Sequence, residues 1–176
     1  QLGAFTHFGS NEQLAGEAVG TRLAAENFKH PVCVIQEQGH VGLEARCAGV
    51  KAMVPGTEIL YVEGKDMTSV QSTATAKLQA TNDADVIIGL GAPITLTLLK
   101  SVTDAGSSAK VASFDLNADL AQKIVDGAVL FTVDQQPWLQ GYGAVDALWQ
   151  NKRGGFSIGG GQSVLIGPDN GLLAPA

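Results

Sequence analysis

The sequence has little positive charge and no long apolar run, and these absences exclude several classes of protein. Of its 176 residues, 11 are Lys or Arg and 17 are Asp or Glu, so the formal net charge is −6. A nucleic-acid-binding surface needs clustered positive charge, and no basic segment of that kind is present. No apolar run approaches the ~20 residues of a membrane-spanning helix. We therefore expect no nucleic-acid partner and no membrane span within this sequence.

Common catalytic and metal-binding patterns are also absent. The three histidines do not have the spacing of a metal site, and no Gly-x-Ser-x-Gly elbow occurs. Cys47 falls inside a predicted helix without an obvious histidine partner. Gly89 and Gly91 follow a predicted strand, but the third glycine of a dinucleotide-binding fingerprint is missing. These observations predict a protein that is not an enzyme and that uses no cofactor or metal.

The sequence contains only two cysteines, Cys33 and Cys47. Cys33 lies on a predicted strand and Cys47 on the helix that follows it, so the two side chains can face each other. A disulfide closing so short a loop would stabilise the fold by roughly 3 kcal/mol on the chain-entropy model. Two buried free thiols are the alternative, and two cysteines alone do not define the redox compartment.

Short apolar runs that alternate with helix-like segments dominate the first 133 residues. Such alternation is typical of βαβ units, in which a parallel sheet is covered by helices on both faces. We therefore predict an α/β fold, a doubly wound three-layer sandwich with a mainly parallel six-stranded sheet. The predicted strands are residues 4–8, 32–35, 59–62, 85–88, 111–114 and 130–133, and helices fill the segments between them.

The pattern changes after the sixth predicted strand. Pro137 suits the first turn of a helix that runs to about Lys152, because its missing N–H would have no helical partner there. A glycine-rich loop, a short strand at 163–166 and a loose tail to Ala176 follow. Helical spacing places four large apolar residues on one face of the predicted helix: Trp138, Tyr142, Val145 and Trp149.

Polar residues gather at the predicted carboxyl ends of the strands, where open α/β sheets bind ligands. A sugar hydroxyl both donates and accepts, so carboxylates and amides beside a guanidinium suit a neutral polyhydroxylated ligand. The alternative is that each residue is an ordinary helix cap or turn residue, as Asn11 can be. The residues on this edge include Glu37, Arg46, Gly91, Asp115 and Gln135.

Five segments resemble sugar-binding proteins of ABC importers, of the ribose-binding type. They are Asn11-x-x-x-Ala15-Gly16, the segments 32–39 and 43–49, Phe114-Asp115-Leu116, and 133–142 with its Asp134-Gln135-Gln136-Pro137 core. The resemblance implies that Arg46, Asp115 and Gln135 hydrogen-bond the ligand, with Gln135 at a hinge. Leu90 or Gly91 stands where close ribose binders often have asparagine. The candidate ligand-binding residues are thus Arg46, Asp115, Gln135, Glu37, Gly91 and Asn11.

The resemblance also implies two α/β lobes that close on a sugar. This chain resembles the C-terminal lobe, so a missing N-terminal lobe is an expected partner. Residues 1–136 would form the sugar-binding lobe, 137–162 a crossover helix and glycine-rich loop that normally pack on the missing lobe, and 163–176 a returning strand and tail. Without that lobe, we predict that the apolar helix face packs on the retained lobe or on another copy of the chain.

The function implied by the resemblance is the substrate-binding component of an ABC-type sugar importer. Its partners would be a small-molecule sugar and the membrane permease, and its location the periplasm or the outer face of the cell membrane. The chain starts at Gln1 rather than Met, so we expect a processed or cut product. Two alternatives stay open: the effector-binding domain of a lac-repressor-type regulator, and a small nucleotide-dependent α/β enzyme.

Overall fold

Strands and helices alternate along the chain, as predicted. The structure is a computed structural model that describes residues 4, 6–81, 83–158, 163–166 and 172–173. The strands are β1 (His7–Ser10), β2 (Pro31–Ile35), β3 (Glu58–Tyr61), β4 (Val86–Gly89), β5 (Lys110–Phe114), β6 (Thr132–Val133), β7 (Ser163–Ile166) and β8 (Leu172–Leu173). The helices are α1 (Glu12–Ala25), α2 (Val41–Met53), α3 (Met67–Ala80), α4 (Ala92–Ala105), α5 (Ala118–Val125) and α6 (Pro137–Gly154).

The main sheet has six strands in the order β3-β2-β4-β5-β6-β8. Its first five strands run parallel, and β8 pairs antiparallel with β6. The register places Cys33 beside Ile88 and Ile88 beside Ala112. Parallel strands end at the same edge, so the loops after β2, β4, β5 and β6 meet there. The predicted mainly parallel sheet is confirmed.

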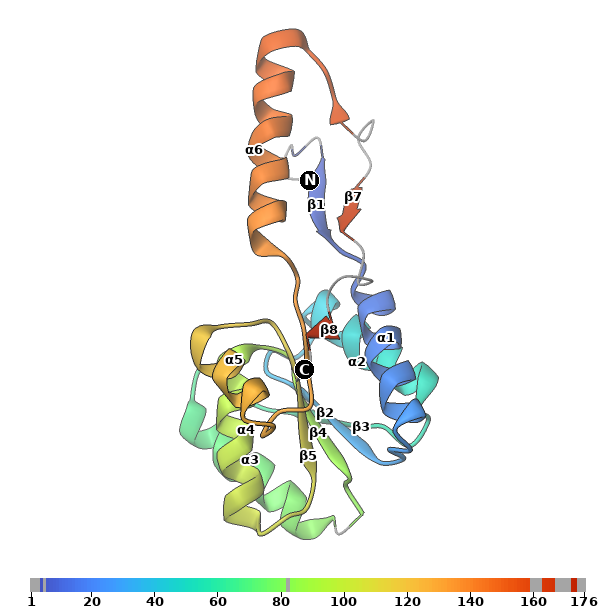
Figure 1. Cartoon of the computed structure of the whole chain (residues 1–176), viewed down its shortest axis with the longest axis vertical. Helices are drawn as coiled ribbons and strands as arrows, with labels where there is room; N and C mark the ends of the chain where they lie inside the picture. The colour runs from blue at the N-terminus through green and yellow to red at the C-terminus, as the bar shows by residue number, and fades with distance from the viewer. Residues whose placement is uncertain (1–3, 5, 82, 159–162, 167–171, 174–176) are drawn as a thin grey trace.

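Helices cover both faces of this sheet, which makes the predicted three-layer sandwich (Figure 1). Alternate residues of the fully buried strand β2 point to opposite faces. Cys33 and Ile35 join the apolar cluster beneath α1 and α2, whereas Val32 and Val34 join the cluster beneath α3, α4 and α5. A strand that is buried on both faces has a continuous apolar sequence, and this is why β2 could be predicted from the sequence.

The membership of the sheet differs from the prediction at its first strand. The predicted strand at 4–8 is not part of the main sheet: β1 begins at His7 and pairs in parallel with β7, in a separate two-stranded sheet. β8 is instead the sixth strand of the main sheet. β1 is only partly buried, and its short apolar pattern could not identify its pairing partner.

Helix α6 begins at Pro137, as predicted, and runs away from the main sheet alongside β1 and β7 (Figure 1). It packs on β1, where a Cβ built on Gly143 would lie 2.7 Å from Cδ1 of Phe8. The predicted apolar face stays open: Trp138 is 75% exposed and Trp149 is 56% exposed. In this chain the face does not pack on the main sheet, and the predicted packing on the retained lobe or on another copy stays a prediction.

Two parts of the predicted organisation, the glycine-rich loop at 159–161 and most of the tail after 166, lie outside the described residues. Within the described ranges, no helix combines the length and the hydropathy needed to cross a bilayer.

Candidate functional site

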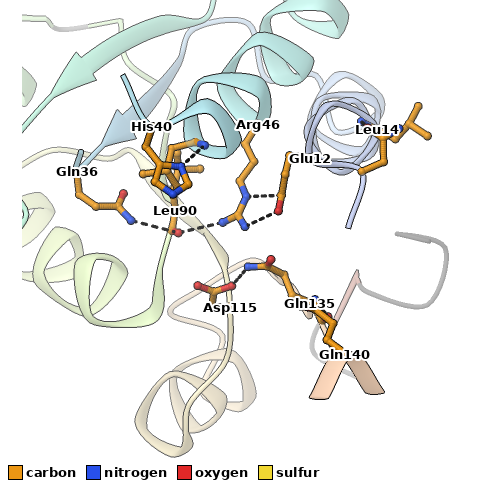
Figure 2. Close-up of polar contacts among 11 residues, drawn as sticks. Glu12, Leu14, Gln36, His40, Arg46, Leu90, Asp115, Gln135 and Gln140 are labelled. Atoms are coloured by element: carbon orange, nitrogen blue, oxygen red, sulfur yellow. Dashed lines mark hydrogen bonds and ion pairs between the residues drawn. The ribbon is translucent and has the colours of Figure 1, made fainter. Parts of the chain in front are cut away.

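Four of the predicted site residues meet at the carboxyl edge of the main sheet, beside the crossing from β6 to α6. Gly91 follows β4, Asp115 follows β5 and Gln135 follows β6, while Arg46 reaches the same edge from α2. Figure 2 shows the Asp115 carboxylate and the Gln135 amide on the side toward which the Arg46 guanidinium points. The sheet topology thus brings together residues that are far apart in the sequence.

Arg46 is held by two partners. Its Nε donates to Oε2 of Glu12 over 2.6 Å and its Nη2 to Oε1 over 3.2 Å, while Nη1 donates to the Leu90 carbonyl oxygen over 3.2 Å. The guanidinium carbon lies 4.9 Å from the centre of the Phe114 ring. These bonds use three of the five guanidinium N–H groups. Arg46 is 6% exposed, so its planar fork is fixed in one orientation.

Close packing of α1 on α2 puts Glu12 within reach of Arg46. A Cβ built on Gly16 would lie 2.1 Å from the Arg46 carbonyl oxygen, and one built on Gly49 would lie 2.3 Å from that of Gln13. Glycine at both positions lets the two helix backbones touch. Asn11 caps the start of α1 by accepting a bond from the Leu14 N–H over 3.1 Å, so Glu12 sits in the first helical turn.

Asp115 and Gln135 are bonded to each other and to the backbone around them. The Gln135 amide donates to Oδ1 of Asp115, and the Thr132 hydroxyl donates to the Asp115 carbonyl oxygen. Gln140 of α6 donates to the Gln135 carbonyl oxygen over 2.7 Å. Asp115 and Gln136 both have left-handed backbone, with φ of 65° and 52°. Non-glycine residues in this region are found at ligand sites and hinges, where surrounding bonds maintain the strain.

The Asp115 carboxyl is less acidic than an ordinary aspartate. Burial raises the pKa of Asp115, and the charges of Glu12 and Asp134 raise it further. The Arg46 guanidinium and the Gln135 hydrogen bond lower it in part. Arg46 and Asp115 thus interact electrostatically, but among the described residues the ion pair of Arg46 is with Glu12. The Asp115 carboxylate keeps acceptor capacity for a ligand.

Gly91 lies between Asp115 and a residue that was not predicted, Gln36. A Cβ built on Gly91 would lie 3.5 Å from Nε2 of Gln36 and 3.7 Å from Oδ2 of Asp115. The backbone of Gly91 is extended, with φ of −172°, so its conformation does not require glycine. The missing side chain leaves space between an amide and a carboxylate.

Two pockets open along this edge of the sheet. The smaller, of about 240 Å³, is lined by Asp115, Leu116, Asp134, Gln135, Pro137 and Gln140. The larger, of about 670 Å³, includes Gln36, Glu37 and Lys65 in its lining. The structure therefore puts the candidate Glu37 in the second pocket, apart from Asp115 and Gln135. Asn11, also a candidate, uses its side-chain oxygen as the cap of α1.

Sequence reasoning missed Glu12, Gln36 and Gln140. Glu12 lies in a first helical turn, where acidic residues are common, and its pairing with Arg46 spans 34 residues. Gln36 follows the buried strand β2, and Gln140 lies in the predicted crossover helix, where it was part of a matched motif but was given no role at the site. One signal was available for all three, since Glu12, Gln36 and Gln140 each lie within a segment that resembles the sugar-binding proteins, namely 11–16, 32–39 and 133–142.

The disulfide that the sequence left open is present in the structure, between Cys33 of β2 and Cys47 of α2, with Cα atoms 5.8 Å apart. It ties α2 to the sheet one residue from Arg46, and both cysteines are fully buried. Among the described residues, no three His, Cys, Asp or Glu side chains are grouped so as to hold a metal ion.

Comparison with known proteins identifies the fold. The chain is 44% identical to a carbohydrate transporter from Acidothermus cellulolyticus 11B solved in complex with myo-inositol, with a TM-score of 0.89 over 96% of this chain and 61% of that one. It is 24% identical to a periplasmic sugar-binding protein of an ABC sugar transporter from Legionella pneumophila, with a TM-score of 0.82 over 92% and 62% of the two chains. A periplasmic ribose ABC transporter from Conexibacter woesei is 17% identical, with a TM-score of 0.81 over 94% and 58%.

The chain spans about three fifths of the length of these solved structures. The two structures below 25% identity show a shared fold only. No curated protein matches the sequence. Residues 2–155 match the family described as periplasmic binding protein domain, and the chain therefore belongs to the periplasmic binding protein family.

Proposed function

We propose that the chain supplies one lobe of the substrate-binding component of an ABC-type sugar importer and binds a monosaccharide or related polyol. The observation that carries this proposal is the convergence of the Arg46 guanidinium, the Asp115 carboxylate and the Gln135 amide at one edge of the sheet. The family match and the 44% identical carbohydrate transporter with bound myo-inositol support it.

The chemistry of the edge suits hydroxyl groups. A ligand hydroxyl can donate to Asp115 and accept from one of the two guanidinium N–H groups that the bonds among the described residues leave over. Charged partners make both bonds stronger than bonds between neutral groups. Binding of this kind needs no chemical step, which agrees with a non-enzymatic role.

The proposed organisation has two lobes that close on the ligand. Residues up to 136 would form the sugar-binding lobe, 137–162 the crossover helix and loop that pack on a second lobe, and 163–176 the returning strand and tail. β1 and β7 pair with each other and α6 packs on β1. We therefore propose to amend this division: β1, α6 and β7 belong together beyond the hinge, and β8, which pairs with β6, is the strand that returns to the sugar-binding lobe. The closed form would be recognised by a membrane permease, in the periplasm or at the outer face of the cell membrane.

Calorimetric titration of the chain tests the proposal. The ligands are myo-inositol, ribose, arabinose and glucose, with NAD as the representative of a nucleotide-dependent enzyme. We expect at least one polyol to bind with millimolar affinity, because a single lobe makes only part of the contacts, and NAD not to bind. Absence of binding by all four polyols would contradict the sugar-binding proposal. Micromolar binding by this chain alone would contradict the two-lobe part.

A further inference from the structure

We infer that Gln36 is a further ligand-contacting residue, whose side-chain amide donates to a ligand hydroxyl beside Gly91 and so helps to decide which polyols fit. This inference rests on the proposed function and assigns a new residue to the same site. Gln36 follows β2 and lines the larger pocket, whereas Asp115 and Gln135 line the smaller one. Gln36 therefore extends the site across the sheet edge.

The Gln36 amide shares a backbone acceptor with Arg46. Its Nε2 donates to the Leu90 carbonyl oxygen over 3.4 Å, and Nη1 of Arg46 donates to the same oxygen over 3.2 Å. Figure 2 shows the two side chains approaching this oxygen from opposite sides. The Leu90 carbonyl oxygen thus holds the Gln36 amide and the Arg46 guanidinium close to each other. Nε2 of Gln36 carries a second N–H that the bond to Leu90 does not use.

Space for a ligand hydroxyl exists next to Gly91. A Cβ at that position would lie in ordinary contact distance of both neighbours, 3.5 Å from Nε2 of Gln36 and 3.7 Å from Oδ2 of Asp115. Because Gly91 has no side chain, both groups border open space at this point, and a ligand hydroxyl that enters it could accept from the Gln36 amide or donate to the Asp115 carboxylate. A polyol offers several hydroxyls that both donate and accept, so it suits a donor and an acceptor placed side by side.

The Gln36 amide is poorly satisfied within the protein. Among the described residues, its Oε1 is buried without a hydrogen-bond partner, and the bond from Nε2 to Leu90 is long. Exchanging the amide oxygen and nitrogen would direct an oxygen at the Leu90 carbonyl, so the orientation is fixed by that acceptor. A buried acceptor without a partner destabilises the fold. Stability therefore does not account for an amide at this position, and the second N–H of Nε2 is available to a ligand.

Substitution of Gln36 separates a role in ligand binding from a role in the stability of the fold. Gln36→Met keeps the length of the side chain and removes the amide, and Gln36→Glu keeps the acceptors and removes the donor. Loss of one hydrogen bond to the ligand should weaken binding of the best polyol about three- to tenfold. The melting temperature of Gln36→Met should be unchanged or higher. Gln122→Met is the matched control, because the Gln122 amide is exposed and bonds only Asp126 among the residues described.

Calorimetry and amide NMR on the same samples give the result. We expect weaker polyol binding by both Gln36 variants, unchanged binding by Gln122→Met, and a ligand-induced shift of the Gln36 side-chain NH₂ signals in the wild-type chain. Wild-type affinity in Gln36→Met, or a lower melting temperature with unchanged affinity, would overturn the inference and leave the proposed function intact. Failure of the wild-type chain to bind any tested polyol would overturn both.

Discussion

At the scale of single residues, Glu12 is the group that positions Arg46. The carboxylate accepts two bonds from the guanidinium, and only 7% of the Arg46 side chain is exposed. A buried arginine without its partner is an uncompensated charge, and it is free to turn toward other acceptors. Glu12 therefore contributes to binding through Arg46 and has no need to touch the ligand.

We predict that Glu12→Gln weakens polyol binding severalfold and lowers the free energy of unfolding by about 1–3 kcal/mol. Glu26→Gln is the control, since Glu26 pairs with Arg22 at the exposed end of α1 over 2.9 Å, and loss of such a pair costs less than ~1 kcal/mol. Denaturant unfolding and calorimetry measure the two effects. Unchanged affinity in a destabilised Glu12→Gln would show that the pair is structural only.

Asp115 predicts a pH dependence with opposite signs for stability and for binding. Burial is the largest cause of its raised pKa, so the charged form is disfavoured in the folded protein. The stabilising contribution of the protonated group is fully present below the ordinary pKa and is lost as the pH rises through the raised folded pKa. Binding has the opposite dependence, because a ligand hydroxyl needs the carboxylate as acceptor.

Asp115→Asn should therefore be more stable than the wild type at neutral pH, and this difference should vanish as the pH falls through the folded pKa of Asp115. Its polyol affinity should be lower at neutral pH and nearly independent of pH. Thermal melts and titrations across the acidic range test both statements. A variant that is less stable than the wild type at neutral pH would mean that hydrogen bonding, not burial, dominates at Asp115.

At the scale of elements, the disulfide joins α2 to β2 directly beside Arg46. The two cysteines are 14 residues apart in the sequence. On the chain-entropy model, removing a crosslink that closes a loop of this length lowers the free energy of unfolding by about 3 kcal/mol. We predict that the double variant Cys33→Ala, Cys47→Ala unfolds at a lower temperature and that the untreated wild-type chain has no free thiol. Mass measurement with and without reductant and alkylation tests the bond. Two alkylated cysteines in the unreduced, unfolded protein would contradict it.

The helices and strands also show how much of the fold and of the site could be predicted from the sequence. The strands β2, β4 and β5 and the helices between them were predicted within a few residues, because apolar runs buried on both faces are distinctive. Arg46, Gly91, Asp115 and Gln135 were predicted at one edge because the ends of parallel strands share it, and the family resemblance then singled out Arg46, Asp115 and Gln135. Three features were not predicted: the pairing of β1 with β7, the contact between Glu12 and Arg46, and the position of the Gln36 amide. Each depends on contacts between segments that are distant in the sequence, and such contacts leave no local pattern.

At the scale of the whole molecule, the apolar face of α6 is exposed in this chain. Its Trp138 and Tyr142 rings stack 5.2 Å apart, and Val145 and Trp149 continue the exposed face. An apolar face of this kind favours association. We propose that a second lobe covers it in the two-lobed protein and a second copy when this chain is alone.

We predict that the chain self-associates with rising concentration and that Trp138→Gln with Trp149→Gln shifts it toward the monomer. Val125→Gln is the control, because Val125 is about as exposed as Trp138 but lies on α5. Sedimentation velocity over a concentration series measures the effect. A wild-type chain that stays monomeric at all concentrations would defeat the prediction.

The central claim is that the edge formed by Arg46, Asp115 and Gln135 binds a polyol. Backbone amide NMR during titration with myo-inositol and the pentoses tests it most directly, because it detects weak binding and locates it. We predict saturable shifts of the backbone amides of Gly91, Asp115 and Gln135, and the loss of these shifts in Arg46→Met. Shifts confined to other surfaces, or no saturable shifts with any of these ligands, would contradict it.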